Sequence, residues 1–463
     1  MTQADGVNDY RRRITAPGGA PRPMLRFRDG IGLVVGIVVG AGIFSAPSIV
    51  AGNAADPLIM LSAWVLGGLI SLAGAMCYAE LATMHPHPGG DYHYLRLAFG
   101  KTVSFLFAWA RLTIIPTGSI ALLAFVFGDY ASQLLTLGAR SSALYAALMV
   151  VLLTALNLIG LRQGKWTQNL LTLIEVTGVG LVIIVGLLLV SASPAADARP
   201  AVSQATNWGL MLVFVMLTYG GWNEAAYISA ELRDPRRNIA RVLLWSIAIV
   251  TALYVLINLG YLNALGLAGM SDSQALAADV MRLGLGPWGA QLVSLFIAIA
   301  ALTSANATIL MGARATYAFG RDVALFSALG RWRGSAPAGA LLVQAGITLA
   351  LVLLGTVTRG GFETMVEFTA PVFWLFFLLA GVSLFVLRVR EPDAPRPFRV
   401  PLYPLTPVVF CCVCAYLLYA SIVHTGIGAL FGIAVLICGV PAWWLTRARA
   451  RTAVRRRSPD ARH

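Results

Sequence analysis

Two short glycine clusters inside apolar stretches of the chain could bind a polar ligand through their backbone. Gly40-Ala41-Gly42 lies in the middle of an uncharged stretch, Gly30 to Asn53, and Gly220-Gly221 interrupts a later one. Each glycine weakens a helix by about 1 kcal/mol relative to Ala, so both stretches are predicted to break. In lipid, freed N–H and C=O groups persist only where protein or a water-filled cavity satisfies them. Each break therefore offers donors and acceptors to a ligand.

The first cluster also has a structural interpretation. Gly32, Gly36 and Gly40 recur every four residues, the small-residue pattern by which membrane helices pack closely. The second cluster favours the functional interpretation, because it falls five expected spans later in a span of opposite direction. Paired interruptions in two halves of opposite orientation are typical of inverted-repeat transporters with a site near the midplane. A zwitterion fits such a pair, since helix ends offer N–H groups to its carboxylate and carbonyls to its ammonium group.

Two charged residues are expected inside spans. Glu175 lies about ten residues into its span, roughly 15 Å deep at the helical rise, and Arg111 lies at a similar depth in another. An intramembrane carboxyl group is costly and indicates function by default. Burial favours its neutral form, so Glu175 could take up and release a proton. It could also form a static ion pair, with Arg111 the candidate partner by depth, or be a polar bystander.

Other polar and aromatic residues each have two interpretations. Tyr219 and Trp222 could line a pocket or pack in the core, and Glu224 could face a cavity or a neighbouring helix. Small polar residues in span 8 could bind sodium or substrate, or could bond to their own helix; these are Thr303, Ser304 and Asn306. Glu80 and Glu231 lie at expected inner helix ends and could form inner-gate ion pairs or be solvated loop charges. His85 and His87 are expected to be loop residues, with pH sensing as the alternative.

The composition is that of a polytopic membrane protein. Hydrophobic residues make up 58% of the 463 residues and charged residues 12%, with a mean hydropathy of +0.77, whereas soluble domains carry about 25% charged residues. The net charge of +14 reflects Lys and Arg in loops, as the positive-inside rule predicts, and not nucleic-acid binding. All five Cys fall in expected spans, so no disulfide framework, metal or cofactor is expected. The Walker, HExxH and GxSxG motifs of enzymes are absent from the sequence.

Twelve spans with both termini in the cytoplasm satisfy the charge pattern. The Arg-rich segment before Gly30 has no apolar core and is therefore a tail, not a signal peptide. The expected regions are a tail at 1–29, a core at 30–401 with spans 1–5 at about 30–190 and spans 6–10 at about 207–387, spans 11 and 12 at 402–445, and a tail at 446–463.

Four motifs spread over most of the chain resemble one family. They are G-I-V-V-G-A-G-I-F (36–44), Y-A-E-L-A-T-M-H-P-H-P-G-G-D-Y-H-Y (78–94), Y-G-G-W-N-E-A-A-Y-I-S-A-E-L-R-D-P-R-R-N (219–238) and R-P-F-R-V-P-L-Y-P (396–404). Together they resemble the amino acid–polyamine–organocation superfamily, and within it the L-type amino acid transporter branch. The resemblance implies an all-α, LeuT-type five-plus-five inverted repeat in which helices 1 and 6 are broken, with transport of amino acids by alternating access.

The resemblance also implies a substrate site on the two breaks. The substrate carboxylate would meet backbone near Val38, Ala41, Gly42 and Ile43, and the amino group would meet carbonyls near Leu217, Thr218 and Gly220. Gly40, Tyr219 and Trp222 complete the candidate substrate-binding set.

The sequence departs from that branch at several positions. Ala41 stands where the branch commonly has Ser, Leu217 where it has a gating Phe, and Glu175 where many relatives have a Lys that resembles a substitute for sodium. Animal relatives bond a partner glycoprotein through a Cys after span 3. The corresponding loop here, Ala131 to Ser141, has no Cys, so no disulfide-linked heavy chain is expected.

The sequence thus predicts a secondary transporter of amino acids in the cytoplasmic membrane, and neutral amino acids are the expected substrates. It would work as a proton symporter or as an exchanger. Two alternatives stay open: a polyamine or organic-cation carrier, and a membrane sensor that binds amino acids without moving them.

Overall fold

The structure is a computed structural model of the whole chain. It describes residues 27–85, 90–159, 165–190, 205–224, 235–331, 337–358, 360–423 and 426–447. The regular elements within these ranges are all helical. The expected all-α class is therefore confirmed for the part of the chain that the structure describes.

The described residues form a series of helices with short connections. In chain order they are α2 (Phe27–Val38), η1 (Ala41–Phe44), α3 (Ala46–Gly52), α4 (Pro57–Met84), α5 (Gly90–Phe99), α6 (Lys101–Thr113), α7 (Ile115–Leu134), α8 (Ser141–Ile159), α9 (Lys165–Ile184), η2 (Val185–Leu189), α10 (Trp208–Thr218), η4 (Trp222–Glu224), α12 (Pro235–Asp272), α13 (Leu276–Asp322), η6 (Ala324–Phe326), α14 (Ala338–Thr358), α15 (Gly361–Arg390), α16 (Leu405–Val423) and α17 (Ile427–Ile437).

Nine helical segments among the described residues are long and apolar enough to cross a membrane. Their mean hydropathies lie between 1.7 and 2.4, and a span needs roughly 20 apolar residues. Many large apolar side chains on these helices are exposed, among them Leu69, Leu148 and Leu353, which is the surface that lipid covers. The chain is therefore a multi-pass membrane protein.

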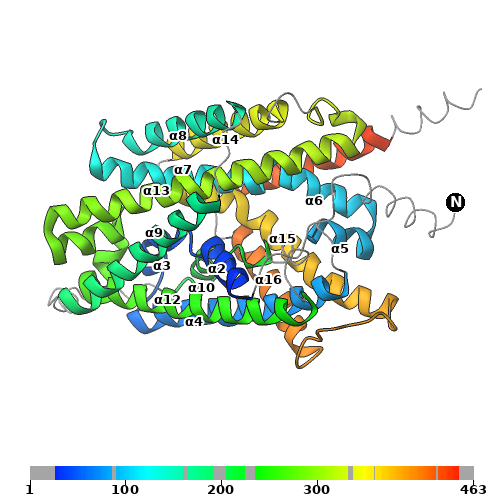
Figure 1. Cartoon of the computed structure of the whole chain (residues 1–463), viewed down its shortest axis with the longest axis horizontal. Helices are drawn as coiled ribbons and strands as arrows, with labels where there is room; N and C mark the ends of the chain where they lie inside the picture. The colour runs from blue at the N-terminus through cyan, green and yellow to red at the C-terminus, as the bar shows by residue number, and fades with distance from the viewer. Residues whose placement is uncertain are drawn as a thin grey trace, which may run out of the picture.

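The interrupted helix α2 lies in the middle of the bundle (Figure 1). In that view α13 and α7 run above it and α12 and α4 below it, while α8 and α14 form the upper edge. The most extensive helix contacts join α13 to α7, α12 to α4, and α7 to α8. The two broken stretches thus lie among long helices that can hold them in place.

A buried carboxylate joins the end of α4 to the end of α15. Glu80 is fully buried and accepts two hydrogen bonds from Arg388, from Nε to Oε1 at 2.7 Å and from Nη2 to Oε2 at 2.6 Å. The backbone N–H of Val400 donates to Oε2 at 2.7 Å, and Arg396 Nε lies 3.8 Å from Oε1. Of the two interpretations of Glu80, the ion pair is the one that forms. We call this end of the molecule the tether end.

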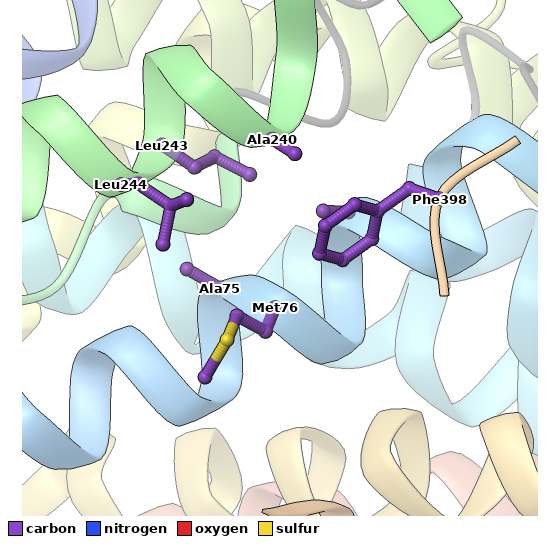
Figure 2. Close-up of a pocket in the computed structure, with 7 residues that line it drawn as sticks. Ala75, Met76, Ala240, Leu243, Leu244 and Phe398 are labelled. Atoms are coloured by element: carbon purple, nitrogen blue, oxygen red, sulfur yellow. The ribbon is translucent and has the colours of Figure 1, made fainter. Parts of the chain in front are cut away.

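The loop after α15 also covers a small apolar gap between α4 and α12. Figure 2 shows Phe398 of this loop pointing toward both helices. The gap is lined by Ala75, Met76, Ala79, Ala240, Leu243, Leu244 and Phe398. Because this lining is entirely apolar, the gap cannot satisfy the charges of a zwitterion. It marks where the loop after α15 packs on α4 and α12.

Replacement of Glu80 by Gln should destabilise the protein strongly. The substitution leaves the Arg388 guanidinium without its charged partner, and breaking a buried ion pair costs about 3–5 kcal/mol. We expect a clear fall in the midpoint of thermal unfolding of the purified protein in detergent. Arg399→Gln is the matched control, because Arg399 is exposed on the same loop and surface changes cost within about 0.5 kcal/mol. Equal unfolding midpoints for the two variants would contradict a stabilising role of the Glu80–Arg388 ion pair.

Candidate functional site

The first broken stretch leaves helical geometry where the glycines predict it. Helix α2 ends at Val38, and Gly40 takes an extended conformation with φ −102° and ψ −175°. Its N–H donates to Val38 O at 2.7 Å. The chain then forms the single turn η1 before α3 begins. Backbone groups around Gly40 are consequently outside any regular helical ladder.

The second broken stretch ends α10 at Thr218. Tyr219 N–H still donates to Val215 O at 3.0 Å, but Gly220 N–H bonds to Leu217 O at 3.0 Å, which tightens the last turn. Gly221 follows with φ +108°, a conformation that residues other than glycine rarely adopt. This glycine therefore produces the interruption that its sequence position predicts.

The two breaks lie against each other. A Cβ built on Gly42 would lie 3.6 Å from Thr218 Oγ1. A Cβ built on Gly221 would lie 2.9 Å from Ile37 Cγ2 and 3.2 Å from Ile37 O. Any side chain at either glycine would enter this contact, so the small residues allow the two backbones to approach.

One tyrosine hydroxyl joins the last carbonyls of the two interrupted helices. Tyr254 of α12 lies 2.8 Å from Val38 O and 3.0 Å from Thr218 O through its hydroxyl, and it is fully buried. A hydroxyl has one hydrogen, so it donates to one of these carbonyls at a time. Val38 O has a second donor in Gly40 N–H. The Thr218 carbonyl is therefore the more available acceptor for a ligand.

The two aromatic residues next to the second break point into the packed core. Tyr219 donates its hydroxyl to Trp64 O at 2.9 Å. Trp222 lies with its ring centroid 5.2 Å from that of Tyr78 and 5.4 Å from that of Phe377. Of the two interpretations given for Tyr219 and Trp222, the structure places both rings in packing contacts. Their backbone remains part of the break.

The side chains of the first break are also buried. Val38, Ala41 and Ile43 are exposed by 3% or less, so this segment presents backbone more than side chains to a ligand. Leu217 is half-buried. A Cβ on Gly220 would lie 3.8 Å from Phe373 Cζ, which places an aromatic ring of α15 beside the second break.

Glu175 is buried close to the two breaks. Its side chain is on α9, which packs on α13 and α12, and the residue is 6% exposed. Its Oε1 atom is buried without a hydrogen-bond partner among the described residues. The Glu175 carboxyl group interacts electrostatically with the Tyr254 hydroxyl. The carboxyl group thus lies near the hydroxyl that joins the breaks.

The structure does not bring every candidate to this site. Arg111 is half-buried on α6, and no ion pair joins it to Glu175 in the described part of the chain. Thr303 donates to Ile299 O of its own helix at 2.9 Å. Asn306 accepts a hydrogen bond from Asn157 Nδ2 at 2.6 Å, which links α13 to α8. Ser304 is half-buried on α13.

The remaining candidates lie at the tether end or outside the described residues. His85 Nε2 is 3.2 Å from Glu391 Oε2. Burial lowers the pKa of His85, and the Glu391 carboxylate opposes this effect. The side chain of Glu224 and the whole of Glu231 and His87 lie outside the described residues. Within those residues, no group of three or more His, Cys, Asp or Glu is arranged to hold a metal ion.

Sequence reasoning missed three polar residues at the breaks. Tyr254 and Tyr130 each bond a carbonyl of the first broken stretch, Tyr130 at 3.1 Å from Phe44 O, and Ser45 Oγ is buried without a partner among the described residues. One signal was available: a buried tyrosine must find a partner for its hydroxyl. Freed carbonyls are the natural acceptors in an apolar span.

Known proteins are similar to this chain over most of its length. The family model described as "Amino acid permease" matches residues 25–440. The chain is 30% identical to the b(0,+)-type amino acid transporter 1 of Rattus norvegicus over 86% of this chain and 82% of that protein. It is also 30% identical to the large neutral amino acids transporter small subunit 2 of Mus musculus, over 89% of this chain and 79% of that protein. Interrupted helices of this kind are typical of membrane transporters, the match places the chain in that class, and it belongs to the amino acid permease family. It is an amino acid permease and not an enzyme.

Loss of the Tyr254 hydroxyl should impair transport without loss of packing. In Tyr254→Phe, two buried carbonyls lose their shared donor, and an unsatisfied buried group costs about 1–3 kcal/mol. We expect the ratio of maximal exchange rate to KM to fall about tenfold in proteoliposomes. Tyr261→Phe is the control, because Tyr261 is fully buried on the same helix and its hydroxyl lacks a partner among the described residues. Equal losses in both variants would rule out a specific role for Tyr254.

Proposed function

We propose that this permease moves neutral amino acids across the cytoplasmic membrane by alternating access, as a proton symporter or as an exchanger. The observation that carries the proposal is the arrangement around Tyr254. Its hydroxyl joins Val38 O and Thr218 O, and the buried Glu175 carboxyl lies within its electrostatic range. The proposed zwitterion site at the two breaks and the proposed proton site at Glu175 are thus next to each other.

The contact between the breaks supports a zwitterionic substrate. In this proposal the amino group is bound by carbonyls near Leu217, Thr218 and Gly220, of which Thr218 O shares its donor with a second carbonyl. The carboxylate is bound by backbone near Val38, Gly40, Ala41, Gly42 and Ile43. A relative named as a large neutral amino acids transporter and the apolar side chains around the breaks both favour a neutral substrate side chain.

The burial of Glu175 supports its role as the proton site. A carboxylate without a partner in an apolar interior is very unfavourable, so the protonated form is favoured while the site is closed. Access of water during the transport cycle would allow the proton to leave. Arg111 is on another helix and without an ion pair to Glu175 among the described residues, so a static pair between them has no support.

The proposed architecture is the twelve-span, LeuT-type arrangement with both termini in the cytoplasm. In this proposal helices 1 and 6 of that arrangement are the two interrupted stretches, α2 to α3 and α10 to η4, and the breaks in them support it. The Arg-rich tails and loops support the orientation. The lack of Cys in the loop from Ala131 to Ser141 supports a transporter without a disulfide-linked heavy chain.

Counterflow in proteoliposomes tests the substrate and the coupling together. Vesicles are loaded with a mixture of unlabelled amino acids, and each labelled amino acid is offered outside, with and without a pH gradient. We expect a neutral amino acid to accumulate and an inwardly directed proton gradient to increase its uptake several-fold in the wild type. In Glu175→Gln we expect exchange to persist and the response to the gradient to disappear.

A matched control and three outcomes decide between the alternatives. Glu363→Gln removes a carboxylate from the exposed start of α15 and should leave the response to the gradient intact. If Glu175→Gln and the wild type exchange amino acids at equal rates, and neither rate responds to the pH gradient, the protein is an uncoupled exchanger. Accumulation of a polyamine instead of an amino acid would support the organic-cation alternative. Binding without movement of any amino acid would support the sensor.

A further inference from the structure

Helix α12 carries a row of three polar residues on one face. Tyr254, Asn258 and Tyr261 follow one another at positions i, i+4 and i+7, a spacing that places residues on the same side of a helix. All three are fully buried. At the helical rise of 1.5 Å per residue the row is about 10 Å long. Polar groups in an apolar interior are unfavourable unless they are hydrogen-bonded, so this row needs partners.

Two of the three side chains have a polar atom without such a partner. Asn258 Nδ2 donates to Tyr254 O at 2.8 Å, but Asn258 Oδ1 and the Tyr261 hydroxyl are buried without a hydrogen-bond partner in the described part of the chain. An unsatisfied buried group costs about 1–3 kcal/mol. Ordered water is the usual partner of buried polar groups that the protein itself does not satisfy. The row on α12 can therefore bind water.

Helix α13 contributes a third group of this kind. Ser294 is fully buried, and its Oγ has no hydrogen-bond partner among the residues that the structure describes. Two residues further on, Phe296 lies against α9, where a Cβ on Gly178 would be 3.8 Å from Phe296 Cβ. Helix α9 packs on both α13 and α12 (Figure 1). Ser294 is consequently in the same part of the bundle as Glu175, which precedes Gly178 by about one helical turn.

One end of the row meets the proposed proton site. The Tyr254 hydroxyl interacts electrostatically with the Glu175 carboxyl group. Glu175 Oε1 is itself buried and lacks a hydrogen-bond partner within the described ranges. A water molecule bound by Asn258 would thus lie one helical turn beyond the residue that adjoins the carboxyl group.

The other end of the row leads to the surface. The Tyr261 hydroxyl interacts electrostatically with that of Tyr130 on α7, and Tyr130 interacts in turn with Asp129 and Asp279. Asp279 accepts a hydrogen bond from Arg282 at 2.7 Å, and its side chain is 31% exposed. Polar groups therefore continue from the buried Glu175 to a carboxylate that water can reach.

We propose that Asn258 and Tyr261 are positioning residues that hold a hydrogen-bonded row of water molecules, a water wire, along which protons pass between the surface at Asp279 and the carboxyl group of Glu175. A proton from bulk water enters at the Asp279 end, each water passes one proton to the next, and the last water protonates the Glu175 carboxylate. Release of the proton reverses these steps. The inference rests on the proposed function of Glu175 as the proton site, and assignment of Asp279 to the outer side rests on the orientation proposed above.

Infrared spectroscopy in proteoliposomes measures proton access to Glu175 without any transport. The C=O stretching band of the protonated carboxyl group is identified as the band that Glu175→Gln removes, and it shifts when H₂O is replaced by D₂O. We expect this shift to be about tenfold slower in Asn258→Leu and in Tyr261→Phe, the effect of one lost hydrogen bond on a rate. Counterflow at equal pH on both sides, which does not use the water wire, shows that each variant is folded.

Ser246→Ala is the matched control. Ser246 is also fully buried on α12 with an unpartnered Oγ among the described residues, but it precedes Tyr254 by eight residues and so lies beyond the other end of the row. Its deuterium shift should proceed at the wild-type rate. Wild-type rates in Asn258→Leu and Tyr261→Phe would overturn the water wire. Equal slowing in Ser246→Ala would overturn it as well, because the effect would then come from packing in general.

Uptake driven by a pH gradient separates the water wire from the proposed coupling. In Asn258→Leu and Tyr261→Phe we expect this uptake to slow several-fold, because the proton reaches Glu175 more slowly, while counterflow at equal pH is retained. If the deuterium shift slows in both variants but wild-type uptake ignores the gradient, the water wire stands and proton coupling fails. If Glu175→Gln removes no band, Glu175 holds no proton, and the proton site and the water wire fail together.

Discussion

The fold depends on how two interrupted helices satisfy their freed carbonyls in an apolar interior. Lipid offers no partner for such groups, and an unmade hydrogen bond there costs more than a made one contributes. Part of this constraint is met by the hydroxyl of Tyr254, placed between Val38 O and Thr218 O. Val38 O has a second donor in Gly40 N–H, so Thr218 O is the acceptor left incompletely satisfied. In the proposed function, a transported ligand uses this residual capacity.

The long helices around the breaks can be understood from this requirement. The Tyr254 hydroxyl must stay within hydrogen-bonding distance of both carbonyls, which fixes the position of its ring. Its ring packs on Trp64 and Tyr219 at centroid distances of 5.7 and 4.9 Å, and Tyr219 is in turn fixed by its bond to Trp64 O. Helix α4, which supplies Trp64, is itself fastened at its far end through Glu80. The position of the Tyr254 hydroxyl therefore depends on its packing against α4.

The breaks were predictable from the sequence, whereas the groups that satisfy them were not. Gly40-Ala41-Gly42 and Gly220-Gly221 act locally, through helix propensity and permitted φ, so their effect can be read from a few neighbouring residues. The burial of Glu175 follows equally from its place in an apolar run. Tyr254 and Val38 are 216 residues apart, and Glu80 and Arg388 are 308 apart. No local pattern specifies such pairs, and the direction of the Tyr219 and Trp222 rings likewise depends on neighbours from distant helices.

The first broken stretch is held at both ends by tyrosine hydroxyls, Tyr254 at Val38 O and Tyr130 at Phe44 O. A typical hydrogen bond contributes about 0.5–1.5 kcal/mol net, which changes an equilibrium roughly two- to tenfold. Apolar packing of the same stretch would contribute a larger free energy, because that free energy scales with the buried area. It would be lost only when the packed surfaces move apart, so it could not pass from one partner to another. Hydroxyl contacts are instead weak enough to exchange one carbonyl for another, or for a substrate group, at little cost. A segment fastened in this way can change partners during a transport cycle while its neighbours on α4 and α12 stay packed.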